Sequence, residues 1–263
     1  MLAHQRQERI LEALRQSGGV RVSDLTEALD VSYMTIRRDL DALAERGLIE
    51  KVHGGAMTVD ERSGAEEPGF EAKSQRERTE KDAIAAAAAS LVRPGTAIGL
   101  TAGTTTWALA RHLIDIPDLT VVTNSIPVAE VMRDLSRTDF SIVLTGGLRT
   151  PSDALVGPVA EAAIQSMHVD MLFMGVHGMD ERTGFTTPNL LEAQTNRAFI
   201  RSARRLIVVA DHTKWGVVGL STIARLDEAA VLITDGALAP GTRELVEAQV
   251  GELIAAPLER EAA

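Results

Sequence analysis

The stretch 20–57 constrains this chain more than any other, because it predicts two helices separated by a tight turn. Ser23 and Ser32 are good N-caps for these helices, since a serine hydroxyl can accept a hydrogen bond from a free N–H of the first turn. Apolar residues of the second helix recur three and four positions apart, so they form one stripe that must pack on the first helix. The stripe consists of Ile36, Leu40 and Leu43.

Packing of this stripe leaves a polar face exposed at the start of the second helix. Tyr33, Thr35, Arg37 and Arg38 lie on that face. A short exposed face of hydroxyl groups and paired arginines is what the major groove of DNA accepts. The alternative is a helical packing element with no role in nucleic-acid binding. It is disfavoured because core helices seldom leave such a face uncovered.

Further features complete the outline of a winged helix-turn-helix. An apolar stripe predicts a helix over residues 3–17, ahead of the other two. Gly47 is suited to the C′ position that ends the second helix. A short hairpin is expected next, turned back at Gly54-Gly55, and its residues 51–53 offer a second polar contact surface.

The charge of the chain argues against nonspecific coating of nucleic acid. The 263 residues carry a formal net charge of −10. Residues 1–57 contain eight Lys/Arg and nine Asp/Glu, whereas the remainder contains 19 and 28. A DNA-binding interpretation must therefore rest on local charge asymmetry in the first part of the chain. The acidic remainder is not expected to face DNA.

Composition also excludes several classes of protein. The absence of cysteine rules out disulfides and thiolate metal sites, and it fits a reducing compartment. The six histidines show neither H-x3-H nor HExxH spacing, so we predict no metal site and no cofactor. The N-terminus lacks the apolar core of a signal peptide, and the longest apolar run, residues 83–92, is too short to span a bilayer. We expect a soluble cytoplasmic protein without a membrane partner.

The second part of the chain predicts a parallel sheet covered on both faces. Residues 58–79 are interpreted as a linker between a DNA-binding domain at 1–57 and an α/β domain at 80–263. Thr79 and Asp82 are expected to form a capping box for the first helix of that domain. Short apolar runs then alternate with helical patterns, which is typical of such sheets. The predicted strands are 97–100, 119–123, 140–145, 171–176, 206–210 and 231–234, and helices are predicted near 105–114, 126–136, 158–167, 188–203 and 241–250.

Polar and glycine-rich segments follow three of these strands in succession. The carboxyl ends of parallel strands meet at one edge of a sheet, where ligands bind. Residues 101–106 also open a helix, so their free N–H groups and the helix dipole suit a phosphate or another anion. The alternative for each segment is an ordinary turn with polar caps. The predicted ligand contacts are Thr101, Gly103, Thr104, Thr105, Thr106, Thr123, Asn124, Ser125, Gly146 and Gly147.

Charged residues from later segments are expected to complete this site. Asp211 and Lys214 follow the fifth predicted strand, and Glu192 lies on the helix after Pro188. Among them Lys214 is the best candidate cation for a phosphate or a sugar hydroxyl. The alternative for each residue is a solvated loop charge.

These residues resemble a known family. The segment 31–56, VSYMTIRRDLDALAERGLIEKVHGGA, is similar to the winged helix-turn-helix of DeoR/GlpR-type bacterial transcriptional regulators. This chain departs from the family at Thr101, a position where the family commonly has an acid. The second part of the chain resembles that family's sensor domain in Lys81, Gly103-Thr104-Thr105-Thr106, Thr123-Asn124-Ser125, Gly146-Gly147, Gly157 and Asp211-x-Thr-Lys214-Trp215-Gly216.

The resemblance implies a homo-oligomeric repressor, a dimer or a tetramer, that binds a double-stranded DNA operator. It also implies a Rossmann-like sensor domain with the ribose-5-phosphate-isomerase-like fold. That domain would bind a phosphorylated sugar or a related metabolite and control carbohydrate-metabolism genes. The implied DNA contacts are Ser32, Tyr33, Thr35, Arg37, Arg38 and His53.

An enzyme is the alternative from another class, because a sugar-phosphate isomerase with an accessory helical domain would suit the sheet and its anion loops. An isomerase needs a positioned general base near the ligand, normally a carboxylate. The first strand ends offer Thr101, Asn124 and Gly146 instead, and the sugar-isomerase Asp-Gly-Ala-Asp signature is absent. We therefore predict no catalytic residue.

Overall fold

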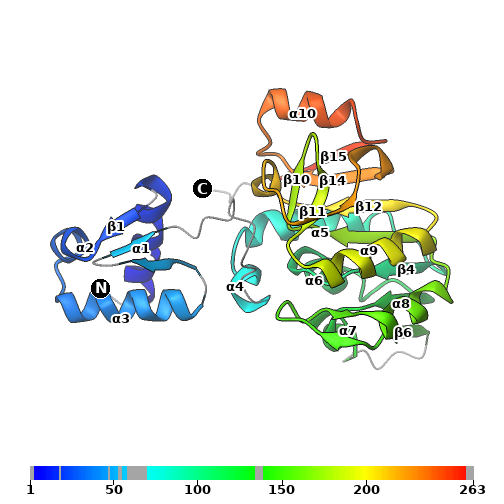
Figure 1. Cartoon of the computed structure of the whole chain (residues 1–263), viewed down its shortest axis with the longest axis horizontal. Helices are drawn as coiled ribbons and strands as arrows, with labels where there is room; N and C mark the ends of the chain where they lie inside the picture. Colours follow the sequence, from blue (N-terminus) through cyan, green and yellow to red (C-terminus); the bar gives the residue numbers. More distant parts are fainter. Residues whose placement is uncertain are drawn as a thin grey trace. The chain divides into compact units, whose positions relative to one another are not determined.

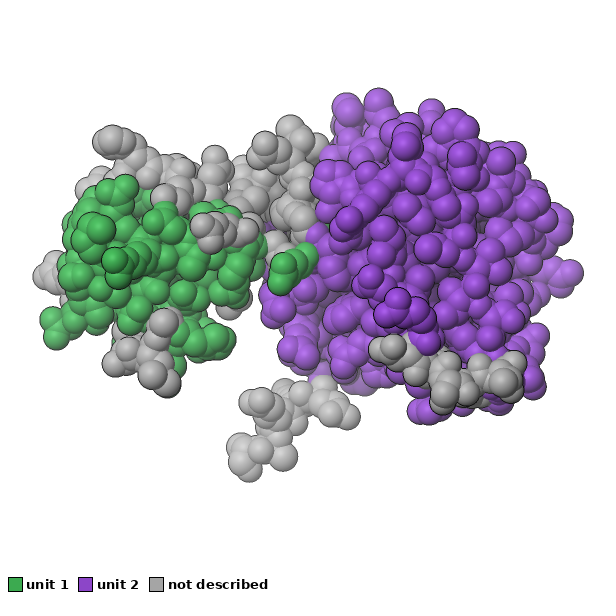
Figure 2. Space-filling view, turned by 90° about the horizontal axis from the view of Figure 1, so that it is seen from below, with its two compact units in different colours: residues 1–61, 71–73 green, residues 62–70, 74–263 purple. Residues whose placement is uncertain are grey.

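The structure is a computed structural model that describes residues 3–17, 19–46, 48–52, 55–57, 70–133 and 139–258. The chain forms two compact units, drawn in Figure 1 and coloured separately in Figure 2. The first unit comprises residues 1–61 and 71–73, and the second comprises residues 62–70 and 74–263. Each unit has an apolar core of its own.

The first unit combines helices with a small antiparallel sheet (Figure 1). The stripe predicted for its third helix is buried against Ile10 and Leu14 of the first helix and Leu25 of the second. This is the predicted winged helix-turn-helix arrangement. Its elements are α1 (Ala3–Ser17), β1 (Gly19–Arg21), α2 (Val22–Leu29), α3 (Tyr33–Glu45), β2 (Glu50–Val52) and β3 (Gly55–Met57), and the strand order is β1-β3-β2.

One capping prediction in this unit is wrong. Helix α2 begins at Val22, so Ser23 lies inside its first turn, and the Ser23 hydroxyl donates to the Asp24 carboxylate at 2.9 Å. The cause is strand β1, which the sequence did not indicate. It pairs with β3 and passes directly into α2, which places Val22 in the core. Gly47 and Gly54 lie outside the described residues.

The second unit is built on a seven-stranded sheet in the order β15-β14-β12-β9-β4-β5-β6. All neighbouring strands in it are parallel. Six of the strands agree with the predicted ranges to within one residue, and β15, at the edge, is additional. The strands are β4 (Ala97–Leu100), β5 (Leu119–Thr123), β6 (Phe140–Leu144), β9 (Met171–Gly175), β12 (Leu206–Val209), β14 (Val231–Asp235) and β15 (Leu253–Ala256).

Side chains of these strands alternate between two apolar cores, one on each face of the sheet. Phe173 packs in one core, whereas its neighbours Leu172 and Met174 pack in the other. The prediction of a sheet buried on both faces is therefore confirmed. The first core is covered by α5 (Arg78–Ala89), α6 (Thr104–His112) and α7 (Ile126–Arg133), and the second by α8 (Pro158–Gln165), α9 (Leu190–Ser202) and α10 (Pro240–Glu247).

The segment predicted as a linker contains a helix. Residues 58–69 lie outside the described part of the chain, but Phe70–Ser74 forms the short helix α4. Phe70 packs its ring edge-on against Trp107 of α6, with ring centroids 5.8 Å apart. This aromatic contact anchors the start of α4, inside a segment whose charge and Gly and Pro residues predict a linker.

The predicted capping box of α5 is also wrong. The helix begins ahead of both Thr79 and Asp82, and its N-cap is Glu77, in the left-handed region at φ 45°. The ammonium of the buried Lys81 donates to the Arg76 carbonyl at 2.6 Å. A lysine inside the helix therefore closes the turn that a side chain at the cap was expected to close.

Among the described residues, no helix is long and apolar enough to cross a membrane.

Smaller elements are additional to the predicted ones. One antiparallel sheet has the order β10-β11-β13, a second pairs β7 with β8, and two short 3-10 helices occur. Their bounds are β7 (Leu148–Arg149), β8 (Leu155–Val156), β10 (Gly178–Asp180), β11 (Gly184–Thr187), η1 (His212–Lys214), β13 (Ser221–Ala224) and η2 (Leu226–Glu228).

Helix α9 offers a matched test of the second core. Phe199 is 1% exposed, whereas Leu190 on the same helix is 57% exposed. We expect Phe199→Ala to lower the free energy of unfolding by about 3–5 kcal/mol, because the ring is lost and a cavity remains. Leu190→Ala should change it by less than about 0.5 kcal/mol. Denaturant titration followed by far-UV circular dichroism measures both, and equal losses would contradict this packing.

Candidate functional site

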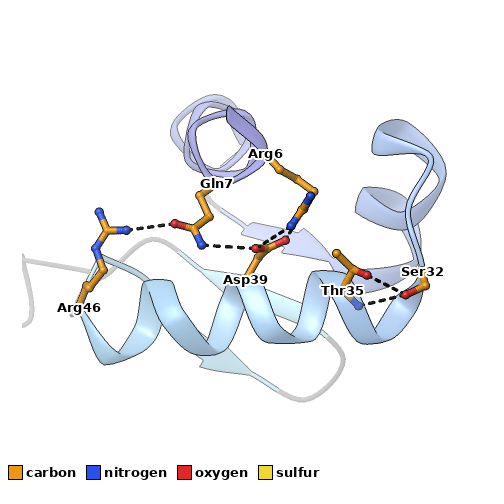
Figure 3. Close-up of polar contacts among 6 residues, drawn as sticks. All are labelled: Arg6, Gln7, Ser32, Thr35, Asp39 and Arg46. Atoms are coloured by element: carbon orange, nitrogen blue, oxygen red, sulfur yellow. Dashed lines mark hydrogen bonds and ion pairs between the residues drawn. The ribbon is translucent and has the colours of Figure 1, made fainter. Parts of the chain in front are cut away.

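The start of α3 is organised by two hydroxyl side chains (Figure 3). Ser32 is the N-cap, as predicted, and its Oγ accepts a hydrogen bond from the Thr35 backbone N–H at 3.2 Å. The two hydroxyl oxygens lie 2.8 Å apart. Both residues are predicted DNA contacts, and the structure shows that they fix the first turn of the helix.

The exposed face of α3 carries the remaining residues of that prediction. Tyr33 is 50% exposed, and Arg37 and Arg38 are both exposed. The Arg37 guanidinium carbon lies 5.9 Å from the centre of the Tyr33 ring, a cation–π contact one helical turn apart. The ring therefore favours one direction for the Arg37 side chain. His53, the predicted contact in the wing, lies outside the described residues.

Met34 shares this face and was missed by the sequence reasoning. Its side chain is 59% exposed, although methionine usually lies in a core. The available signal was its position between Tyr33 and Thr35, on the opposite side of the helix from the apolar stripe. An exposed apolar side chain at this place can contact the methyl group of thymine.

The C-terminal sheet has a topological switch point between β4 and β9, because the chain proceeds outward from β4 in one direction and from β9 in the other. Thr101 directly follows β4 and is fully buried. Its Oγ1 accepts a hydrogen bond from the Gly175 backbone N–H at 3.1 Å. This predicted ligand contact thus joins the two strands at the switch point.

The turn after β4 leads into α6 at Gly103-Thr104. Gly103 is the N-cap residue, and no side chain caps the helix. The Thr106 hydroxyl donates to the Thr101 carbonyl at 2.7 Å, and both Thr105 and Thr106 are buried. N–H groups at the start of α6 therefore lack the oxygen that a serine or aspartate cap would supply, and an anion can take its place.

The predicted residues after β5 hold the neighbouring backbone. Thr123 Oγ1 donates to the Leu100 carbonyl at 2.7 Å, and Asn124 Oδ1 accepts from the Ala102 N–H at 2.9 Å. Ser125 Oγ accepts from the N–H of Val128 at 3.3 Å, so it caps the start of α7. Thr123, Asn124 and Ser125 are all at most 1% exposed. Through Asn124, the end of β5 positions the turn after β4.

Two glycines follow β6, and one of them is needed for the chain's own packing. Gly146 and Gly147 have φ values of 70° and 122°, in the region that favours glycine. A Cβ atom on Gly147 would lie 2.5 Å from the Val156 carbonyl oxygen. At Gly147 the missing side chain therefore makes room for strand β8.

The predicted charged residues are already engaged. Glu192 is buried in the first turn of α9, and its Oε1 accepts from the Thr150 hydroxyl at 2.7 Å. Asp211 is 1% exposed and caps η1 by accepting from the Thr213 N–H at 3.1 Å. Lys214 is half-buried at the end of η1, beyond β12. Sequence reasoning missed Thr150, whose role depends on a residue 42 positions away.

A second missed group is the pair of His212 and Asp235. His212 Nδ1 lies 3.0 Å from Oδ1 of Asp235, which is fully buried at the end of β14. Burial lowers the pKa of His212, but the hydrogen bond to Asp235 and the negative charges of Asp235, Asp211 and Glu77 outweigh it, so the pKa is raised. The described residues contain no group of three or more acidic, His or Cys side chains that could hold a metal ion.

Comparison with known proteins identifies both units. Residues 6–62 match a family model for the DeoR-like helix-turn-helix domain, and residues 76–236 match one for the DeoR C-terminal sensor domain. A putative aga operon transcriptional repressor from Escherichia coli O157:H7 is 37% identical, over 88% of this chain and 86% of that protein. The transcriptional regulator GlpR from Haloferax volcanii is 38% identical, over 94% of this chain and 95% of its own length.

Solved structures show a more distant similarity. Ribose 5-phosphate isomerase A from Methanocaldococcus jannaschii is 18% identical, with a TM-score of 0.39, over 54% of this chain and 55% of its own. Neither value supports a shared activity. The relatives that match over most of the chain are regulators and repressors, so the chain is not an enzyme.

The His212–Asp235 pair predicts a pH dependence of stability. Because the pKa of His212 is raised in the folded chain, its contribution is fully present below the unfolded value of about 6.5 and is lost as the pH rises through the folded value. We expect His212→Asn to destabilise the chain at about pH 6 more than at about pH 9. Denaturant titrations of both proteins at the two pH values measure this, and a pH-independent difference would contradict it.

Proposed function

This chain belongs to the DeoR family of transcriptional regulators, and we propose that it is a repressor whose helix α3 reads operator DNA in response to a phosphorylated sugar. The observation that carries the DNA-binding assignment is the exposed face of α3, where Arg37 lies over the Tyr33 ring. We therefore call α3 the recognition helix. We also propose that it acts in the cytoplasm.

On the recognition helix, Arg37 and Arg38 contact guanine edges or phosphates. Tyr33, Met34 and Thr35 add contacts to bases or to the backbone from the same face. Contacts to the DNA backbone come from the Ser32 hydroxyl at the start of the helix and from His53 of the wing. The mixture of two cations with hydroxyl and apolar groups supports sequence-specific readout over attraction to phosphate alone.

Reading of a genomic operator requires more than one copy of this unit. A good bidentate contact discriminates between bases by about 1–3 kcal/mol, so one short helix face cannot select a single site in a genome. A homodimer or homotetramer reads repeated half-sites, so the free energy that discriminates between sequences adds up over its copies. We therefore propose that the regulator binds its operator as a homo-oligomer.

The effector site that we propose lies at the carboxyl ends of β4, β5 and β9. The uncapped start of α6 suits the phosphate, through the backbone of Gly103 and Thr104, and Lys214 supplies a cation. Glu192 and Asp211 are oxygen acceptors for sugar hydroxyl groups. Hydrogen bonds of Thr101, Thr123 and Asn124 hold the ends of β4, β5 and β9, which supports a preformed phosphate site.

Coupling between the two functions needs only a modest free energy. A difference of about 1–3 kcal/mol between effector-bound and free states changes DNA affinity about 5- to 150-fold. We propose that effector binding biases the segment 58–80, which connects the units, and so changes the spacing of the recognition helices. Carbohydrate-metabolism genes are the corresponding targets.

Substitution of Arg37 tests the recognition helix. We expect Arg37→Ala to lower affinity for a duplex that the wild-type chain selects from a random pool by about 5- to 150-fold, because one base contact is lost. Arg9→Ala, which removes an exposed arginine of α1, is the matched control and should leave affinity within about twofold. Fluorescence anisotropy measures both. Wild-type affinity of Arg37→Ala would refute the assignment of α3.

Thermal shift with pentose and hexose phosphates tests the effector site. A bound ligand at a hundredfold excess over its Kd stabilises the folded chain by about 2.7 kcal/mol, which raises the melting temperature by several degrees. We expect a phosphorylated sugar to do so where its unphosphorylated form does not. The shift should vanish in Lys214→Ala and persist in Arg204→Ala, an exposed cation that precedes β12. Absence of any phosphate-dependent shift would leave the proposed site without a ligand and overturn it.

A further inference from the structure

The recognition helix carries a buried acid directly after its two exposed arginines. Asp39 is only 4% exposed. It follows Arg38 in sequence but lies on the side of Ile36 and Leu43, where α3 faces α1 (Figure 3). The proposed DNA contacts do not use this carboxylate, so its burial requires a separate explanation.

Two consecutive residues of α1 bind the Asp39 carboxylate. Arg6 donates through Nε to Oδ2 at 2.5 Å and through Nη2 to Oδ1 at 3.1 Å, which makes a two-pronged ion pair. Gln7 Nε2 donates to Oδ1 at 3.4 Å. The Arg6 side chain is 12% exposed, so this ion pair is largely removed from water.

A second contact joins the same two helices near the end of α3. Arg46, the C-cap residue, donates through Nη1 to Gln7 Oε1 at 3.1 Å (Figure 3). Asp39 and Arg46 are seven positions apart, which is about 10 Å along a helix. Gln7 therefore bonds to α3 at two points, and together with Arg6 it forms a network that we call the α1–α3 clamp.

Such a clamp restrains helix rotation in a way that the apolar stripe does not. Apolar contacts are non-directional, so leucine and isoleucine side chains tolerate a small rotation of α3 about its axis. A rotation of about 20° moves the surface of a helix, about 5–6 Å from its axis, by about 2 Å. Donor–acceptor distances in hydrogen bonds vary by only about 0.5 Å, so a displacement of about 2 Å would break a hydrogen bond to a base edge. A two-pronged ion pair has one orientation and resists the rotation.

Stability alone is a poor reason for this ion pair. The free energy needed to remove two charges from water is about as large as the free energy of their attraction. Apolar residues of similar volume are therefore often equally stabilising. A directional contact between the helix that reads DNA and its neighbour has a clearer use, because base readout depends on the angle at which the side chains enter the groove.

We propose that Asp39 is a positioning residue for DNA recognition, which sets the rotation of the recognition helix through Arg6 and Gln7 so that Arg37 and Arg38 reach their bases together. This inference rests on the assignment of α3 as the recognition helix. It predicts that loss of the clamp lowers affinity for the specific sequence more than affinity for DNA in general.

The test compares two duplexes at one salt concentration. The first is selected by the wild-type full chain from a random pool, and the second is a scrambled duplex of equal composition. We expect Asp39→Asn to weaken binding to the selected duplex about tenfold or more and binding to the scrambled one by less than about twofold, because the phosphate term is independent of sequence. Asp24→Asn, the same change at an exposed position of α2, should leave both affinities unchanged.

A double variant separates positioning from folding. Arg6→Met combined with Asp39→Leu replaces the ion pair by apolar side chains, which should retain the wild-type melting temperature. We expect its discrimination between the two duplexes to remain reduced, since the apolar pair does not define the rotation of α3. Wild-type discrimination in this folded double variant would overturn the proposal and leave Asp39 a purely structural residue.

Arg37→Ala, measured in parallel, distinguishes the two possible failures. Loss of discrimination in Arg37→Ala with wild-type discrimination in Asp39→Asn would overturn the positioning role alone. Wild-type discrimination in both variants would overturn the recognition helix itself. Loss in both, with the double variant still impaired, supports both inferences.

Discussion

All neighbouring strands of the seven-stranded sheet are parallel, and the arrangement of the sensor unit depends on this constraint. Parallel strands bring every carboxyl end to one edge, while helices on both faces exclude water from the interior. Polar groups that end the strands must then find partners within the chain. Thr101, Thr123 and Asn124 do so by bonding to the backbone of the neighbouring strands and turns. These hydrogen bonds therefore hold the carboxyl-terminal edge of the sheet in place from within the chain.

The sequence allowed the central part of this sheet to be predicted, because strands buried on both faces leave continuous apolar runs. The residues 97–100 and 119–123 were located to their ends in this way. Strand β15 was missed because its Leu-Ile-Ala-Ala run is short, half alanine and at the edge of the sheet. β10 and β11 contain glycines and polar residues without alternation. Their pairing depends on a neighbouring strand that no local pattern indicates.

The candidate site was predictable in its location and less so in the roles of its residues. Strand ends follow from strand positions, so the polar segments after β4, β5 and β6 were found. Whether a hydroxyl is free or bonded depends on residues far along the chain, such as Thr150, 42 positions from Glu192. The pairing of His212 with Asp235 similarly joins the ends of two strands. Sequence spacing carries no signal for contacts of this range.

The same distinction explains how a chain of net charge −10 can carry the DNA-binding face that we propose. A sum of charges along the sequence counts Asp39 against Arg37 and Arg38, the two positive residues directly before it. In the structure the carboxylate is bound by Arg6, which lies 33 positions earlier, and is withdrawn to the opposite side of the helix. The exposed face then keeps both of its positive charges. The electrostatic potential at a surface depends on which charged side chains share that face and on which charges are neutralised elsewhere on the helix.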